Sequence, residues 1–123
     1  MLVEETIYKL WNSFGIPAYE ENSVPSTAKF PYISYQLLTG EYGADSQLTA
    51  SLWYREPTLK NIALKKDEIS DFIGYGGIKL PCKNGYLWIN KADNFASYLG
   101  DPNDQMVKRI VLSINVRFYV GGY

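Results

Sequence analysis

The chain of 123 residues contains no histidine and only one cysteine, Cys82. The absence of histidine excludes Ser-His and Cys-His nucleophilic pairs, histidine acid–base chemistry and most zinc sites. A single cysteine cannot form an internal disulfide, so the simplest expectation is an intracellular place of assembly. Cys82 falls on the apolar side of an alternating pattern, which indicates a buried small hydrophobe and not a nucleophile.

The sequence also lacks a charge excess and a long apolar run. Its formal net charge is −1, and no cluster of Lys and Arg stands out, so neither specific nucleic-acid recognition nor attraction to an acidic membrane is expected. No apolar run approaches the ~20 residues that a membrane helix needs. The first residues, MLVEETIYKLW, have no basic lead, unlike a signal peptide. Without repeats or linkers, residues 1–123 are expected to form one domain.

Carboxylate pairs and glycine-rich stretches offer the remaining candidates for chemistry. The pairs that sequence proximity suggests are Glu20 with Glu21, Glu41 with Asp45, and Asp101 with Asp104. All lie in loop-like or strand-edge sequence, and no motif supports a glycosidase-type reaction. The glycines at 74, 76 and 77 lack the Lys and Ser/Thr of a phosphate loop and follow a helix. We therefore expect no enzyme activity, no metal and no cofactor.

Two amphipathic helices are predicted, over residues 4–14 and 59–73. Gly15 suits the left-handed position after the first helix, and Thr58 suits the N-cap of the second. Leu64 points away from the apolar stripe of the second helix, so it is expected to be exposed or to lie at an interface.

Six strands are predicted from alternating patterns and turn residues. They cover residues 18–22, 32–38, 49–55, 78–83, 86–90 and 108–120. Asn84-Gly85 predicts a hairpin with a type I′ turn, and Asp101-Pro102-Asn103-Asp104 predicts a turn. Residues 91–105 otherwise give no clear pattern. The strand over residues 108–120 is long enough to indicate a central position in a sheet.

Together these elements predict an α+β fold, in which a mainly antiparallel mixed sheet of about six strands carries both helices on one face. On the last strand, the alternate residues from Ile110 to Val120 are apolar and face the helices. Arg109, Arg117 and Tyr119 lie on the opposite side, which a neighbouring subunit could cover.

The stretch of residues 39–48 is longer than the ~2–5 residues of a usual hairpin loop. Its glycines let the backbone bend, its tyrosine offers an aromatic anchor, and its acids could fix register. The residues concerned are Gly40, Glu41, Tyr42, Gly43 and Asp45. The stretch predicts a protein contact, although a mobile solvent loop explains it nearly as well.

Several segments, in order along almost the whole chain, resemble the tail terminator (tail-completion) proteins of long-tailed bacteriophages. They are the opening helix with Gly15-Ile16-Pro17-Ala18-Tyr19; Ser23-Val24-Pro25; Phe30-Pro31-Tyr32-Ile33-Ser34-Tyr35; Ser51-Leu52-Trp53-Tyr54-Arg55; Lys66-Asp67-Glu68-Ile69; Gly85-Tyr86-Leu87-Trp88-Ile89; and Lys108-Arg109-Ile110-Val111-Leu112-Ser113-Ile114. These are structural residues, and none is diagnostic by itself.

The resemblance implies a virion protein at the head–tail junction, assembled in the host cytoplasm. Such a protein forms a ring, usually of six copies, that stops polymerisation of the tail tube and joins the tail to the head-completion proteins. DNA would pass through the lumen without being read, and residues 39–48 would contact the tube or an adjacent ring. Another head–tail connector or tail-tube subunit, and a small nucleic-acid-binding β-domain, stay open as alternatives.

Overall fold

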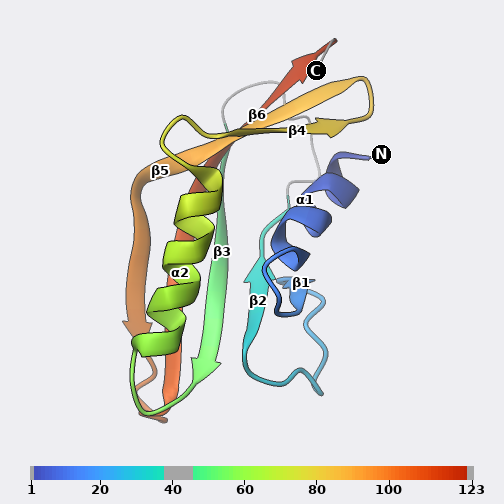
Figure 1. Ribbon diagram of the computed structural model, residues 1–123. Helices are drawn as coiled ribbons and strands as arrows, with labels where there is room; N and C mark the ends of the chain where they lie inside the picture. Colours follow the sequence, from blue (N-terminus) through green and yellow to red (C-terminus); the bar gives the residue numbers. More distant parts are fainter. Residues whose placement is uncertain (1, 38–45, 122–123) are drawn as a thin grey trace.

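The computed structural model describes residues 2–37 and 46–121, which form two helices and one curled sheet of six strands (Figure 1). The elements are α1 (Val3–Asn12), β1 (Ala18–Glu20), β2 (Tyr32–Tyr35), β3 (Ser46–Arg55), α2 (Lys60–Ile73), β4 (Ile78–Cys82), β5 (Gly85–Gly100) and β6 (Val107–Val120). The strand order is β1-β2-β3-β6-β5-β4, and only β1 and β2 pair in parallel. The predicted α+β class and the central position of the last strand are confirmed.

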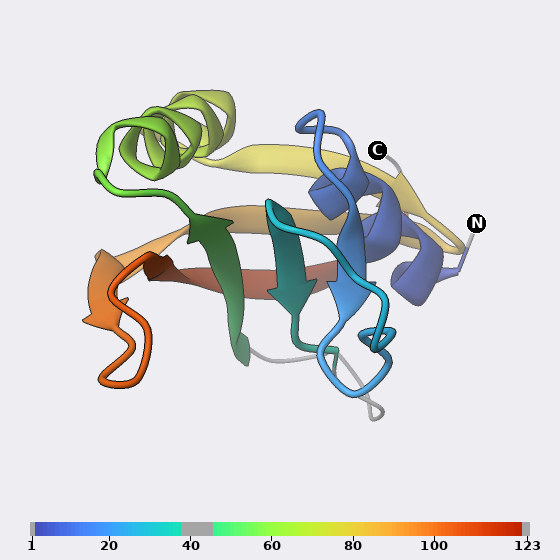
Figure 2. The same cartoon turned by 90° about the horizontal axis from the view of Figure 1, so that it is seen from below.

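Both helices cover the same face of the sheet, as predicted, and the sheet curls around them (Figures 1 and 2). One apolar core lies between the two layers. Its fully buried members include Ile7 and Trp11 from α1, Ile62, Ile69 and Ile73 from α2, and Ile33, Leu52, Leu87, Leu112 and Ile114 from the strands. Neither helix of the described ranges is long and apolar enough to cross a membrane.

The helix ends differ slightly from their predicted positions. α1 ends at Asn12, yet Phe14 beyond it is still only 4% exposed, and Gly15 takes the expected left-handed φ of +83°. At the start of α2, Leu59 and not Thr58 occupies the N-cap position. The Thr58 hydroxyl still accepts a hydrogen bond from the Lys60 N–H at 3.4 Å, so it serves the first turn from one residue further out.

β3 begins at Ser46, so the end of the predicted loop over residues 39–48 is strand. Leu48 is 2% exposed and lies opposite Ile114 of β6, which explains why the strand extends this far. The polar, glycine-containing composition before it concealed the start of the strand. Residues 39–45 lie outside the described residues.

The largest difference lies in β5, which continues to Gly100 where no strand was predicted after Asn90. The pairing with β6 shifts between Lys91 and Ala96, and Asn94 there has a φ of +54°. Such a bulge inserts residues that break the alternation of a regular strand. A search for period-two patterns therefore misses the second half of β5.

β6 alternates as predicted over most of its length, but its apolar face ends early. Ile110, Leu112, Ile114 and Val116 are buried, whereas Val120 is 82% exposed. Val120 lies opposite Gly85, which offers no side chain to pack against. Val120 therefore keeps the predicted alternation, but it lies beyond the end of the core.

The hairpin between β4 and β5 forms where Asn84-Gly85 predicted it, but its turn is not type I′. Cys82 pairs with Gly85, so Lys83 and Asn84 make the turn, and only Asn84 has a positive φ, +68°. Gly85 is the first strand residue, and a Cβ there would lie 1.9 Å from the Tyr119 carbonyl oxygen. Close approach of β6, and not the turn, therefore demands glycine at this position.

We expect Gly85→Ala to lower the free energy of unfolding by about 2 kcal/mol or more, because the added methyl group must push β5 and β6 apart. Urea denaturation followed by tryptophan fluorescence measures the change. Gly76→Ala is the matched control, since a Cβ at Gly76 meets no atom within 4 Å. Equal stability of the two variants would contradict the close-approach argument.

Candidate interaction surface on the outer face of the sheet

The face of the sheet that points away from both helices, here called the outer face, is covered by aromatic and cationic side chains. Strand register places them directly opposite one another, in the pairs Tyr32–Trp53, Trp53–Arg109, Trp88–Arg117, Tyr86–Tyr119 and Lys79–Trp88. Side chains opposite each other on one face are close enough to interact across the strands. The face is thus an ordered surface made of cross-strand contacts.

One cluster is centred on Trp53. Tyr32 stacks on the Trp53 ring, with ring centroids 6.1 Å apart and an interplanar angle of 18°, and Tyr19 meets Tyr32 edge-on at 6.1 Å. The Arg109 guanidinium lies 4.6 Å from the Trp53 ring centroid, and its Nε donates a hydrogen bond to the Ser51 hydroxyl at 3.1 Å. The cation–π contact and the hydrogen bond together hold the Arg109 side chain against the sheet.

A second cluster lies nearer the other end of β6. Tyr86 and Tyr119 stack with ring centroids 5.1 Å apart and an interplanar angle of 16°. Lys79 lies 5.2 Å from the Tyr86 centroid, and the Arg117 guanidinium lies 5.3 Å from the Tyr119 centroid. Arg109 and Arg117 are separated by eight residues of strand, or about 26 Å at ~3.3 Å per residue, so they anchor distinct patches.

A small polar hollow of about 90 Å³ adjoins the second cluster and is lined by Trp88, Asn90, Asn115 and Arg117. The Oδ1 atom of Asn90 is buried there and has no hydrogen-bond partner among the described residues. A buried acceptor left unpaired costs about 1–3 kcal/mol.

Four of the strand residues that point to the outer face are cations. Within the described ranges and outside the β5 bulge, no strand residue on this face is a carboxylate. The cations are Arg55, Lys79, Arg109 and Arg117. Sequence reasoning saw no basic cluster, because these residues lie on three strands and are far apart in the chain. Only the register of β3, β4 and β6 gathers them on one side.

The structure brings together only some of the predicted contact residues. Arg109, Arg117 and Tyr119 share the outer face, as predicted. Leu64 is 58% exposed, as predicted, but it belongs to α2 on the opposite side of the sheet. The other predicted contact residues, Gly40, Glu41, Tyr42, Gly43 and Asp45, lie outside the described residues.

The side chains considered as candidates for chemistry, Cys82 and the carboxylates, make contacts that serve the fold. Cys82 is half-buried and packs against the core, and burial raises the pKa of its thiol. The Glu20 carboxylate accepts hydrogen bonds from the backbone and side chain of Asn22. In the part of the chain that the structure describes, no three Cys, Asp or Glu residues lie close enough to hold a metal ion. Among the described residues, the outer face therefore offers aromatic rings and positive charge to a partner.

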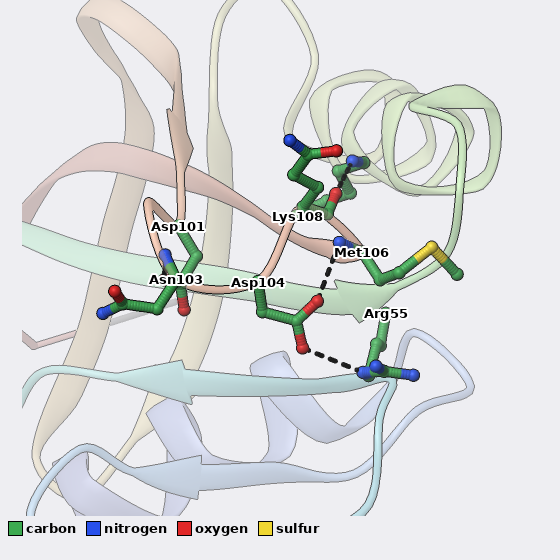
Figure 3. A network of polar contacts seen from close by, with 7 residues as sticks. Arg55, Asp101, Asn103, Asp104, Met106 and Lys108 are labelled. Atoms are coloured by element: carbon green, nitrogen blue, oxygen red, sulfur yellow. Dashed lines mark hydrogen bonds and ion pairs between the residues drawn. The ribbon is translucent and has the colours of Figure 1, made fainter.

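The turn predicted over residues 101–104 forms, and Figure 3 shows the two aspartates, Asp101 and Asp104, at its ends. Asp101 Oδ1 accepts a hydrogen bond from the Asn103 N–H at 2.8 Å. Asp104 Oδ1 accepts one from the Met106 N–H at 2.9 Å, and its Oδ2 lies 3.2 Å from Arg55 Nε. The backbone hydrogen bond from Met106, and after it Arg55, hold the pKa of Asp104 below its usual value.

Because the pKa of Asp104 is lowered by folding, its carboxylate stabilises the fold above its unfolded pKa of about 3.8. That contribution is lost as the pH falls through the lower, folded pKa. Asp104→Asn should therefore be less stable than wild type at pH 7 and lose less stability on acidification. Urea titrations at pH 7 and pH 3 measure this, and parallel losses in both proteins would contradict it.

Arg109→Met should lower the free energy of unfolding by about 1 kcal/mol, because it removes the contact with Trp53 and the hydrogen bond to Ser51. The same substitution at the exposed Lys60 is the control and should change stability by less than about 0.5 kcal/mol. Thermal unfolding monitored by circular dichroism compares the two. A loss no larger at Arg109 than at Lys60 would mean that Arg109 is not fixed to the sheet.

Comparison with models of known protein families and with curated proteins finds no match to this chain.

Proposed function

We propose that the chain is a structural subunit of the virion of a long-tailed bacteriophage, located at the head–tail junction. Copies form a ring, of six in the simplest case, that caps the tail tube, stops its polymerisation and joins the tail to the head-completion protein. DNA passes through the lumen without specific recognition. The resembling segments suggest this role, and the observation that carries it is the outer face, which the protein's own helices leave uncovered.

The composition of the outer face suits a contact between proteins. Tyr, Trp and Arg are enriched in the cores of protein–protein interfaces and dominate their binding energy. On this face Trp53 and Arg109 already hold each other in place, as do Tyr86 and Tyr119. Binding then costs little additional ordering of these side chains.

A ring requires head-to-tail contacts between two different surfaces of the same subunit. The outer face supplies one, and the exposed side of α2 supplies a second on the opposite layer (Figure 2). There Leu64, Asp67 and Asp71 follow one another at i, i+3 and i+7, which places them on one stripe, and all three are exposed. An apolar side chain flanked by carboxylates complements a face of rings and cations.

The nucleic-acid-binding alternative rests on the same aromatic and cationic face. Bases stack on aromatic rings whose outward sides are free. Here Tyr32 and Arg109 both lie against the Trp53 ring, and Tyr86 and Tyr119 stack on each other. This arrangement favours contact with a protein surface. Salt-dependent binding of a single-stranded oligonucleotide at physiological salt would favour the alternative.

Deleting the gene from the phage genome that encodes the chain tests the proposal. We expect tails of uncontrolled length that carry no heads, because nothing then stops tube growth. Electron micrographs of lysates measure the tail lengths, and supplying the wild-type gene in trans should restore joined particles of normal length. An image of the head–tail junction with only one or two copies of the chain at this position would end the idea.

Arg117→Glu, supplied in trans, should fail to restore joined particles if the outer face is the ring contact. Lys29→Glu is the matched control, because Lys29 is exposed in the segment between β1 and β2 and belongs to neither of the two proposed contact surfaces. Arg117 is exposed, so the folded monomer should tolerate the change. Circular dichroism confirms folding of both variants before the complementation test. Full rescue by Arg117→Glu would place the ring contact elsewhere.

A further inference from the structure

We propose that residues 96–100, the second half of β5, form a docking edge that accepts an extended segment of a partner protein as an additional strand. The segment it fits is uncharged along its middle and carries a basic side chain at each end. This inference rests on the sheet edge alone and does not depend on the ring.

The edge exists because β4 is much shorter than β5. β4 pairs with β5 only from Gly85 to Ile89, whereas β6 pairs with β5 as far as Gly100. Alternate residues of an antiparallel strand turn their N–H and C=O groups away from their partner strand. Over residues 96–100 these groups point to a side where, among the described residues, no hydrogen bond reaches them. Figure 1 shows this lower half of β5 at the margin of the sheet.

The edge at β1 is blocked by a side chain from α1. The Ala18 N–H donates to Asn12 Oδ1 at 3.0 Å, and Asn12 Nδ2 donates to the Ala18 carbonyl oxygen at 3.3 Å. The Asn12 amide therefore pairs with Ala18 much as another strand would. β1 is only three residues long, so this one side chain covers much of its free edge.

The edge at β4 is blocked as well. Pro81 lies in the middle of β4 and has no N–H to offer a new strand. Its carbonyl oxygen accepts a hydrogen bond from the Thr6 hydroxyl of α1 at 3.0 Å. Thus β1 and β4 carry devices that prevent strand addition, and residues 96–100 carry none.

The composition of the open edge suits strand addition. Residues 96–100 include no charge and no proline, the usual protections of an edge strand. Tyr98 is 49% exposed and lies on the helix side with Ile110, whereas Leu99 is 46% exposed and lies on the outer face with Arg109. An added strand with apolar residues on both faces could cover Tyr98 on the helix side and Leu99 on the outer face.

Carboxylates at both ends of residues 96–100 favour a partner segment with basic side chains at its ends. Asp93 and Asp101 bracket the segment, both are exposed, and neither makes an ion pair with another described residue. Asp101 also lines a hollow of about 380 Å³ beside Leu99, which has room for a long side chain. Arg109 borders the same hollow, but its guanidinium lies against the Trp53 ring. Lysine or arginine at each end of the partner segment would meet these carboxylates. Two copies of this chain pairing through the same edge would instead bring their aspartates together.

A fluorescently labelled peptide of alternating threonine and valine, with lysine at both ends, serves as the probe. We expect it to bind the whole protein, with slower hydrogen exchange of the amides of residues 96–100 in the complex. The same peptide with glutamate at both ends should bind roughly fivefold more weakly at low ionic strength. Absence of binding at millimolar peptide, or protection elsewhere only, would overturn the proposal.

The double variant Asp93→Lys with Asp101→Asn keeps an acceptor for the Asn103 N–H and should reverse the preference between the two peptides. Equal binding of both peptides to wild type would overturn the assigned partner charge. Concentration-dependent self-association with protected residues 96–100 and no peptide would show that a second copy is the occupant. Neither peptide result depends on ring formation, so failure here and failure of the gene deletion are distinguishable.

Discussion

The alternation of side chains along β6 is the constraint on which the rest of the molecule depends. β6 lies between β3 and β5 and pairs with both along most of its length. Ile110, Leu112, Ile114 and Val116 point to the helices and are at most 7% exposed. Burial of each such side chain stabilises the fold by about 1.5–3 kcal/mol. A slip of one residue would bring Arg109 and Arg117 into the core, so the register is strongly determined.

The same alternation determines the opposite face. Because four apolar residues of β6 must point inward, the residues between them must point outward, and the outward positions include both arginines. No helix of the described ranges covers them. Arg109 is instead held by Trp53 on the neighbouring strand β3, and Arg117 lies against Tyr119, two residues further along β6 itself. The outer face is consequently ordered before any partner arrives, and this order supports its assignment as a contact surface.

Sequence patterns predicted the helices, the layer arrangement and the central strand, because each of these depends on local periodicity. The second half of β5 escaped prediction, since the bulge between Lys91 and Ala96 removes the alternation on which the prediction rests. The role of Gly85 was also misjudged, because its neighbour Tyr119 is distant in the chain. The sequence placed Arg109 and Arg117 on this side of the last strand, but it did not show that Arg55 and Lys79 join them, for the same reason. Properties that arise from contacts between distant strands require the register, which local patterns do not supply.

Unequal strand lengths explain why, among the described strands, residues 96–100 of β5 have no neighbour on one side. β5 has 16 residues, β6 has 14 and β4 has five, so β4 cannot cover β5 along its full length. An uncovered strand edge can be capped by a side chain, as Asn12 caps β1, or protected by a proline, as in β4. An edge with neither protection can pair with a partner. Residues 96–100 have neither protection and expose Tyr98 and Leu99 beside free backbone groups. Within the described ranges, β1 and β4 carry such protections and residues 96–100 carry none, and this contrast is the basis of the proposed docking edge.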